Sequence, residues 1–203
     1  MSFYDIKPGF QALLRPIAAR LFHAGVRANQ VTIGACVISI ALGIWIATAA
    51  SHAVVFLMIP AWLFVRMALN AIDGMLAREF GQASSLGAYL NELADVISDC
   101  ALYLPFALLP GSSPGFVLAV ILLSILSEMA GVLGVMVGAS RRYDGPMGKC
   151  DRAFVFGLLG LLVGFGAPIG EALAAVWGLL AMLIGATIVN RVRRGLDETL
   201  RAQ

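Results

Sequence analysis

The sequence has few charged residues: 14 Lys and Arg and 12 Asp and Glu, together 13% of its 203 residues. Soluble domains carry about 25% charged residues. The formal net charge is only +2, so no strong basic field favours nucleic acid, and we expect no nucleic-acid partner. Hydrophobic residues make up 60% of the chain, against about 45–50% in soluble domains. This balance predicts an integral membrane protein.

Cysteine is also scarce, and the three residues Cys36, Cys100 and Cys150 are far apart in the sequence. Their spacing matches neither a metal knuckle nor a redox pair, and an odd number gives no disulfide framework. We interpret them as free thiols in a reducing or lipid environment. The first residues also lack the basic-then-apolar layout of a cleaved signal peptide, so we expect the first apolar run to be retained.

Long apolar runs fill most of the chain. A helix needs about 20 apolar residues to cross a bilayer, and helices satisfy their backbone hydrogen bonds internally, as lipid requires. The sequence therefore predicts an all-α integral membrane domain over residues 1–203 with six transmembrane helices. Their predicted bounds are 31–50, 53–78, 86–109, 114–139, 152–168 and 171–190.

The segment before the first run, about residues 5–25, has a different pattern. Its large apolar residues recur at roughly helical spacing, with Arg15 and Arg20 between them. This pattern predicts an amphipathic helix that lies on the membrane surface. Pro16 is expected to bend this helix or to mark its start.

The basic residues indicate the topology. The connections at 51–52, 111–113 and 166–170 carry no Lys or Arg. By the positive-inside rule, both termini and the second–third and fourth–fifth connections face the cytoplasm, in an inner membrane. The basic residues on the cytoplasmic side are Lys7, Arg15, Arg20, Arg27, Arg78, Arg141, Arg142, Lys149, Arg152, Arg191, Arg193, Arg194 and Arg201. Arg66 and Glu128 lie inside runs instead, and we expect them to form a mutual buried ion pair.

Acidic and amide side chains gather where the second run ends and the third begins. Asn70 and Asp73 are three residues apart and share one helix face. Asn91, Asp95 and Asp99 follow at intervals of four and form a second stripe. Two antiparallel neighbouring helices would therefore direct these oxygen-bearing side chains to one place near the cytoplasmic surface.

Carboxylates in a membrane helix are energetically costly and usually functional. Oxygen ligands favour Mg²⁺, Mn²⁺ or Ca²⁺ over zinc. The small residues Gly74, Ala77 and Gly87 would leave room for a nucleotide near the backbone. The planar guanidinium of Arg78 could hold a diphosphate.

The spacing of these residues resembles the pattern D-x-x-D-G-x-x-A-R-x(8)-G-x-x-x-D-x-x-x-D of the CDP-alcohol phosphotransferase family. The resemblance covers residues 70–95, and the six predicted spans extend it over most of the chain. Asn70 and Asn91 stand where the family has Asp, as in an Asn-variant bacterial subgroup. The residues that fit the pattern are Asp73, Gly74, Ala77, Arg78, Gly87 and Asp95.

The resemblance implies a role for each motif residue. Asp73 would bind metal, Asn70 and Asn91 would be neutral ligands, and Asp95 would be the catalytic base or a further ligand. The expected cofactor is Mg²⁺ or Mn²⁺, as one or two ions. Because amide ligands add no charge, we expect one tightly bound ion or weaker binding overall. Two nearby acids, Glu92 and Asp99, could compensate. The residues expected to contact the CDP group are Gly74, Ala77, Arg78 and Gly87.

The implied function is that of an enzyme that transfers a phosphatidyl group from a CDP-linked lipid, such as CDP-diacylglycerol, to an alcohol and releases CMP. Its partners would be the donor, the acceptor, membrane lipids and a second copy of the chain. The main alternative is a catalytically impaired protein that binds CDP-lipids, since two acids are absent. A transporter is disfavoured because the acids cluster at one leaflet and no inverted repeat is visible.

The basic connection at 141–152 has two interpretations of equal weight. It could simply set the topology beside anionic headgroups, or it could bind a phosphorylated acceptor. The acceptor-binding residues would then be Arg141, Arg142, Lys149 and, first among them, Arg152. The sequence leaves the acceptor open among glycerol phosphate, inositol phosphate, serine and a lipid headgroup.

Overall fold

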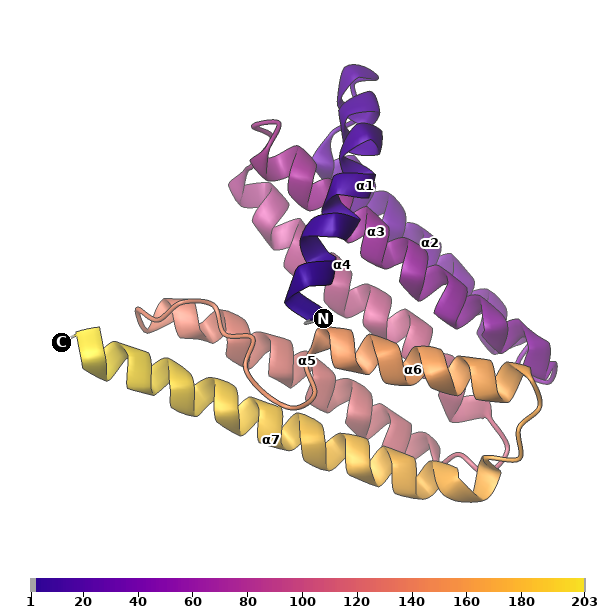
Figure 1. The fold of residues 1–203 in the computed structure, drawn as a ribbon. Helices are drawn as coiled ribbons and strands as arrows, with labels where there is room; N and C mark the ends of the chain where they lie inside the picture. The colour runs from indigo at the N-terminus through magenta and orange to yellow at the C-terminus, as the bar shows by residue number, and fades with distance from the viewer. Residues whose placement is uncertain (1–2, 203) are drawn as a thin grey trace. The chain divides into compact units, whose positions relative to one another are not determined.

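The computed structural model describes residues 3–202, with side chains for residues 9–201, and all regular secondary structure in this part of the chain is helical, without strands. The prediction of an all-α fold is confirmed (Figure 1). The outermost residues of the predicted domain, 1, 2 and 203, and the side chain of Lys7 lie outside the described part. The elements are α1 Phe3–His23, α2 Ala28–Thr48, the 3₁₀ helix η1 Ala53–Leu57, α3 Met58–Arg78, α4 Ser85–Tyr103, the 3₁₀ helix η2 Leu104–Leu108, α5 Pro114–Met136, α6 Lys149–Gly164 and α7 Gly170–Ala202.

The chain divides into two compact units. The first comprises Met1–Ala41 and Ala61–Ser98, and the second comprises Leu42–Pro60 and Asp99–Gln203. Helices α2, α3 and α4 each begin in one unit and end in the other. The single domain over residues 1–203 stays a prediction.

The first unit is organised around contacts between α1 and α3. Leu14 and Ala18 of α1 are buried with Ile72, Met75 and Leu76 of α3. These residues recur at three- to four-residue intervals, which gives each helix one apolar face toward the other. The predicted interfacial helix is therefore a real helix, and it runs from Phe3 to His23 without a break at Pro16. Its outer face keeps apolar side chains: Leu13 is 71% exposed.

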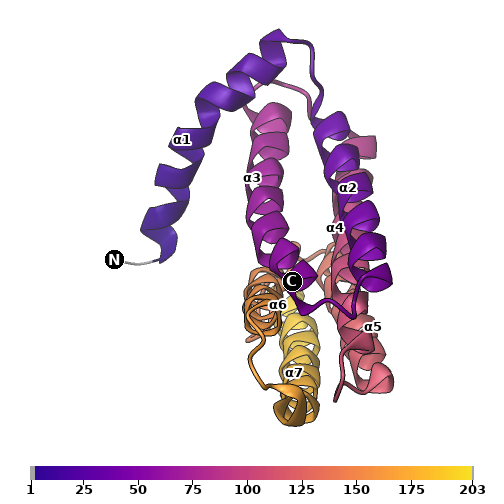
Figure 2. The same ribbon diagram turned by 90° about the vertical axis from the view of Figure 1, so that its right-hand side faces the viewer.

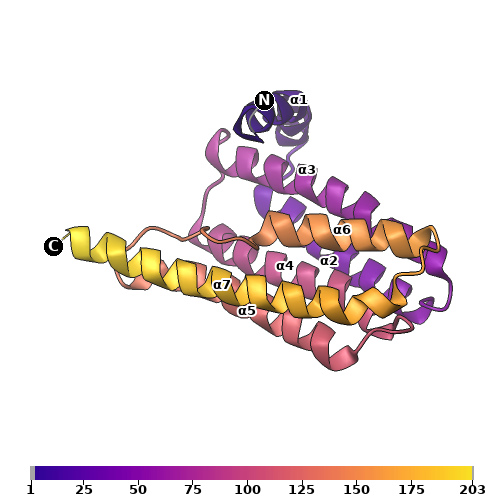
Figure 3. The same ribbon diagram turned by 60° about the horizontal axis from the view of Figure 1, so that its bottom comes forward.

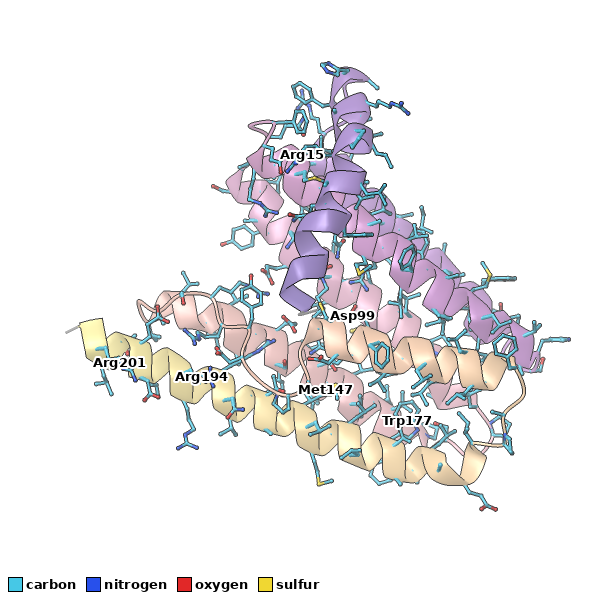
Figure 4. All side chains as sticks on the ribbon, viewed as in Figure 1. Arg15, Asp99, Met147, Trp177, Arg194 and Arg201 are labelled. Atoms are coloured by element: carbon cyan, nitrogen blue, oxygen red, sulfur yellow. The ribbon has the colours of Figure 1, made fainter. Side chains whose placement is uncertain are left out.

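The second unit has an aromatic core. Tyr103 stacks on Phe156 with ring centroids 3.6 Å apart, and Phe106 and Trp177 pack around Phe156. Trp177, labelled in Figure 4, is fully buried and donates from Nε1 to Ser112 Oγ at 3.0 Å. Aromatic pairs of this kind add about 0.5–1.5 kcal/mol beyond their burial, so this cluster stabilises the second unit.

Helices of the second unit pack closely. α6 and α7 lie side by side (Figure 2), and α7 runs along α5 (Figure 3). Gly160 of α6 permits close approach to η1, because a Cβ there would lie 2.9 Å from the Phe56 carbonyl oxygen. The contact between α6 and η1 therefore depends on the absence of a side chain at this position.

Four helical segments of the described chain are long and apolar enough to cross a membrane: Ala28–Thr48, Ala53–Arg78, Pro114–Met136 and Gly170–Arg201. They correspond to four of the six predicted spans. Their outer faces carry exposed apolar side chains such as Ile44, Leu122 and Met182, as lipid contact requires. The other two predicted spans correspond to α4, which continues into η2, and to α6, which has 16 residues. The count of six spans stays a prediction.

Candidate functional site

The predicted motif residues lie in the first unit, on the last turns of α3 and the first turns of α4. A short connection joins the two helices, and Gly81 within it has a φ of +68°, a conformation that favours glycine. The tight connection returns the chain antiparallel to α3, so the two halves of the motif face each other. The contact that shows this is a hydrogen bond from Asn70 Nδ2 to Asp95 Oδ1 at 3.2 Å.

Asp73 is buried, with 5% of its surface exposed. Thr32 of α2 donates from Oγ1 to Asp73 Oδ2 at 2.8 Å and is itself buried. A buried carboxylate that accepts such a bond is fixed in orientation. Thr32 was not predicted as a site residue, because a single threonine in an apolar run carries no motif.

Asp95 contacts an arginine that we assigned elsewhere. Arg66 of α3 donates from Nη2 to Asp95 Oδ1 at 3.1 Å and to the Asp95 backbone carbonyl at 2.9 Å. The Arg66 side chain is 5% exposed and that of Asp95 is 17% exposed. The signal in the sequence was the position of Arg66 four residues before Asn70, on the same face of α3.

The predicted ion pair between Arg66 and Glu128 is wrong. Arg66 pairs with Asp95, and Glu128 accepts a 2.8 Å bond from Arg152 Nη2. Arg66 and Glu128 thus each have an oppositely charged partner within their own compact unit. The position of a residue along its predicted span does not identify its partner, because it does not indicate which helices are neighbours.

Gly74 and Gly87 are both close to polar side chains. A Cβ at Gly74 would lie 2.6 Å from Arg78 Nη2, and a Cβ at Gly87 would lie 2.8 Å from Asn29 Oδ1. The Arg78 guanidinium therefore lies directly over Gly74, one turn away on the same helix. Both positions accommodate polar groups next to bare backbone, as a nucleotide site would require.

The remaining residues of the predicted nucleotide and metal site lie in different surroundings. Ala77 packs against the apolar cluster between α1 and α3. Asn91 and Glu92 are half-buried on α4. Arg78 is exposed, and next to it Glu79 pairs with Arg15 of α1 at 2.9 Å. The Arg15 hydrogen bond holds the pKa of Glu79 below its ordinary value.

The donor set of the first unit fits one divalent cation of the Mg²⁺ or Mn²⁺ type. Two carboxylates, Asp73 and Asp95, are accompanied by the amide oxygens of Asn70 and Asn91, and hard cations prefer oxygen ligands. Within the described residues no three His, Cys, Asp or Glu side chains form a ready cluster. Arg66 also offsets one of the two negative charges. A divalent ion at these residues therefore stays a prediction.

The predicted acceptor residues lie in the second unit, and most already have acidic partners. Arg152 is 1% exposed and lies 2.8 Å from Glu128 and 3.6 Å from Asp99, which is labelled in Figure 4. Arg141 and Arg191 each lie 3.4 Å from Glu128. Three guanidinium groups thus surround one carboxylate. Arg191 was expected only to set the topology, and its inward position depends on α7 continuing well past its apolar run.

Arg142 belongs to a neighbouring network on the surface of the second unit. It pairs with Asp144 at 2.7 Å and with Glu198 of α7, and Arg194 of α7 also reaches Asp144 at 2.8 Å. Burial acts to raise the pKa of Asp144, but the hydrogen bonds from Arg142 and Arg194 outweigh it and hold this pKa below its ordinary value. These pairs hold the connection before α6 against α7, while Lys149 is half-buried at the start of α6.

Comparisons with known proteins agree with this arrangement. The sequence profile of CDP-alcohol phosphatidyltransferases matches residues 26–189. These helices and the motif at 70–95 therefore define a class, and the chain belongs to the CDP-alcohol phosphatidyltransferase family. The resemblance found in the sequence is confirmed.

Two curated relatives are similar in sequence. The chain is 45% identical over 193 residues to the inner membrane protein YnbA of Escherichia coli (strain K12), covering 95% of this chain and 96% of the relative. It is 27% identical over 146 residues to archaetidylinositol phosphate synthase of Aeropyrum pernix, covering 66% of this chain and 73% of the relative.

Solved structures share the fold. Mycobacterium tuberculosis phosphatidylinositol phosphate synthase (PgsA1) with CDP-DAG bound has a TM-score of 0.68 at 23% identity, covering 93% of this chain and 94% of that one. The same enzyme in complex with manganese and citrate has a TM-score of 0.70 at 23% identity, covering 90% and 88%. At this identity the similarity establishes the fold.

Proposed function

We propose that this protein transfers a phosphatidyl group from a CDP-linked lipid, such as CDP-diacylglycerol, to an alcohol and releases CMP. The observation that carries the proposal is the contact between Asn70 and Asp95, which joins the two halves of the family motif. Membership of the family supports the same class of reaction. A relative of the same fold was crystallised with CDP-DAG bound.

In the proposed reaction, the acceptor hydroxyl oxygen attacks the phosphorus that bears the diacylglycerol group. A new phosphorus–oxygen bond forms, the bond to CMP breaks, and Asp95 takes the hydroxyl proton. Arg66 supports this role because its guanidinium holds the Asp95 carboxylate in a fixed position.

Asp73, Asn70 and Asn91, with Asp95, would hold Mg²⁺ or Mn²⁺, and a bound ion would offset negative charge on the diphosphate. The manganese complex of the related fold supports this choice of metal. Arg78, Gly74 and Gly87 would contact the CDP group, the guanidinium by its planar donors and the glycines by open backbone. Ala77 would contribute through its small size at the edge of this surface.

The proposal also covers the membrane arrangement. The six spans follow from the lengths of the apolar runs. The distribution of Lys and Arg puts both termini and the active site on the cytoplasmic side of an inner membrane. The similarity to an E. coli inner membrane protein supports this location. A homodimer is proposed from the family resemblance.

A catalytically impaired CDP-lipid-binding protein is the second candidate. It is favoured by one observation: Asp95 Oδ1 accepts hydrogen bonds from both Arg66 and Asn70. The amide at position 70 thus occupies Asp95 and does not supply the third carboxylate that would increase metal affinity.

The experiment is CMP release from CDP-diacylglycerol in mixed micelles with Mg²⁺ or Mn²⁺ and a panel of alcohols. Asp95→Asn is the matched variant and is expected to lower the rate at least about 100-fold. Donor binding without turnover for any alcohol would establish the second candidate instead.

A further inference from the structure

One flank of α1 in the first unit is exposed and carries both apolar and basic side chains. Leu13 is 71% exposed and Ile17 is 45% exposed. Arg20, one turn further along the helix, is also exposed. Intervals of four and three residues put these three side chains on one side of the helix, while Leu14 and Ala18 are buried against α3. This exposed flank therefore lies beside the packed face and is not covered by the first unit.

The charges of this region have one sign. Residues 9–27 contain Arg15, Arg20 and Arg27 but no Asp or Glu. Glu79, just after α3, neutralises Arg15. Arg20 and Arg27 are exposed and make no ion pair with any residue that the structure describes. An apolar flank with uncompensated arginines fits a membrane surface with anionic headgroups, where the apolar side chains reach the acyl chains and the guanidinium groups meet the phosphates.

A different flank of α1 holds the connection between α3 and α4. Arg15, labelled in Figure 4, donates from Nε to Glu79 Oε2 at 2.9 Å and from Nη2 to Glu79 Oε1 at 3.1 Å. These two bonds fix the guanidinium and the carboxylate in one relative orientation. Phe22 packs on Phe80 with ring centroids 4.8 Å apart. Arg15 and Phe22 are seven residues apart and therefore lie on the same side of α1.

Gln82 extends this attachment to the turn after α1. Its Oε1 accepts from the Ala28 backbone N–H at 2.7 Å, and its Nε2 donates to the Val26 carbonyl at 3.3 Å. The connection that joins Arg78 to Gly87, and so the two halves of the motif, is thus held by α1 and by the turn that follows it.

We propose that the exposed flank of α1 binds a membrane surface with anionic headgroups, and that this contact orders the α3–α4 connection through Glu79, Phe80 and Gln82. A lipid surface that holds α1 reduces its local opening, so the contacts between α1 and the connection are broken less often. The predicted surface helix thereby gains a preferred lipid charge and a physical link to the motif. The effect of this link on turnover rests on the proposed function, whereas the link itself does not.

The test is hydrogen exchange of the full chain in lipid nanodiscs, read separately for residues 9–24 and 79–84. Discs of phosphatidylcholine are compared, at one ionic strength, with discs in which about 30% of the lipid is phosphatidylglycerol. With the anionic lipid, we expect exchange to be about three- to ten-fold slower in residues 9–24 and about two- to five-fold slower in residues 79–84. Equal exchange in the two kinds of disc would overturn the proposal.

Two arginine variants test the lipid contact. Arg20→Gln removes a charge from the exposed flank, and Arg193→Gln makes the same change at an exposed position on α7. Arg20→Gln should lose at least about half of the response to anionic lipid in both segments, and Arg193→Gln should keep it. Equal responses in the two variants would overturn the assignment of this flank. Protection of α1 only in discs that hold two copies of the chain would assign the flank to a second copy and would also overturn the proposal.

Glu79→Gln tests the link between α1 and the connection. This variant breaks the ion pair and frees Arg15 to meet anionic lipid, so residues 9–24 should respond to the lipid at least as strongly as in wild type. The response of residues 79–84 should fall to less than about half of the wild-type response. An unchanged response of residues 79–84 would contradict the link through Glu79.

The two proposals fail differently. Absence of CMP release with every alcohol, despite donor binding, would contradict the proposed enzyme. Hydrogen exchange needs no turnover, so equal exchange of wild type in neutral and anionic discs would contradict the role of α1 alone.

Discussion

Arg66 binds Asp95 twice, through the carboxylate Oδ1 at 3.1 Å and the backbone carbonyl at 2.9 Å. The guanidinium thus fixes both the charge and the position of the residue proposed as catalytic base. It links α3 to α4 within the first unit at the level where Asn70 also reaches Asp95. The pair therefore belongs to the proposed functional site as well as to the helix packing.

Replacing Arg66 by Met should destabilise the protein by about 3 kcal/mol, because Asp95 would keep a poorly compensated charge in a largely buried place. The measurement is thermal or SDS-induced unfolding in detergent. Arg20→Met, at an exposed position on α1, is the control and should change stability little.

The double variant Arg66→Met with Asp95→Asn isolates the pair. Its destabilisation should be less than the sum of the two single effects by at least about 1 kcal/mol. Strict additivity would show that the Arg66–Asp95 contact contributes nothing specific to stability.

Thr32→Val should lower affinity for Mn²⁺ about ten-fold, because Thr32 orients the Asp73 carboxylate through a 2.8 Å hydrogen bond. Ser39→Ala is the matched control: Ser39 is a buried hydroxyl on the same helix that accepts from Trp62 Nε1 instead. It should reduce stability without changing metal affinity. Equal metal affinity for wild type and Thr32→Val would argue against Asp73 as a ligand oriented by Thr32.

Asn70→Asp should make the protein more dependent on a divalent ion. Asn70 Nδ2 now donates to Asp95 at 3.2 Å, and a carboxylate there would repel Asp95 when no cation is present. We expect a lower unfolding temperature in EDTA than for wild type, and about ten-fold tighter Mn²⁺ binding. A variant that is as stable as wild type in EDTA would indicate that the two side chains do not share a cation site.

The connection between α5 and α6 should loosen at acid pH. The pKa of Asp144 is lowered in the folded protein by Arg142 and Arg194, so its contribution is complete above the ordinary Asp pKa of about 4. It is lost as the pH falls through the lower folded value. Hydrogen exchange of residues 140–147, corrected for intrinsic rates, should be about two- to five-fold faster at acid pH than at neutral pH.

Asp144→Asn should show this faster exchange already at pH 7 and should no longer respond to acid in this segment. Asp197→Asn, at an exposed position on α7, makes the same change of charge and serves as control. Equal protection of residues 140–147 from hydrogen exchange in wild type and Asp144→Asn at pH 7 would contradict the role proposed for Asp144.

Helix content and the motif could be predicted from the sequence because both depend on local periodicity. Apolar runs of about 20 residues and the fixed intervals among Asn70, Asp73, Asn91 and Asp95 are properties of single helices. The contact between Asn70 and Asp95 follows from a short antiparallel connection. These elements required no knowledge of distant neighbours.

The partners of buried charges could not be predicted in this way. Arg66 was expected to pair with Glu128 because both lie inside apolar runs, whereas the actual partners depend on which helices are adjacent. The hydrogen bond from Thr32 to Asp73 could not be predicted either, because Thr32 lies on α2, outside the motif. The length of α7, which carries Arg191 and Glu198 past the apolar run, also decided contacts that hydropathy does not report.

The most direct measurement of the central claim is a Mn²⁺ titration by electron paramagnetic resonance in mixed micelles, with and without CDP-diacylglycerol. Wild type should bind Mn²⁺ more tightly when the donor is present, and Asp73→Asn and Asp95→Asn should each weaken that binding at least about ten-fold. Unchanged Mn²⁺ affinity in both folded variants, with the donor present, would contradict a shared cation at Asp73 and Asp95.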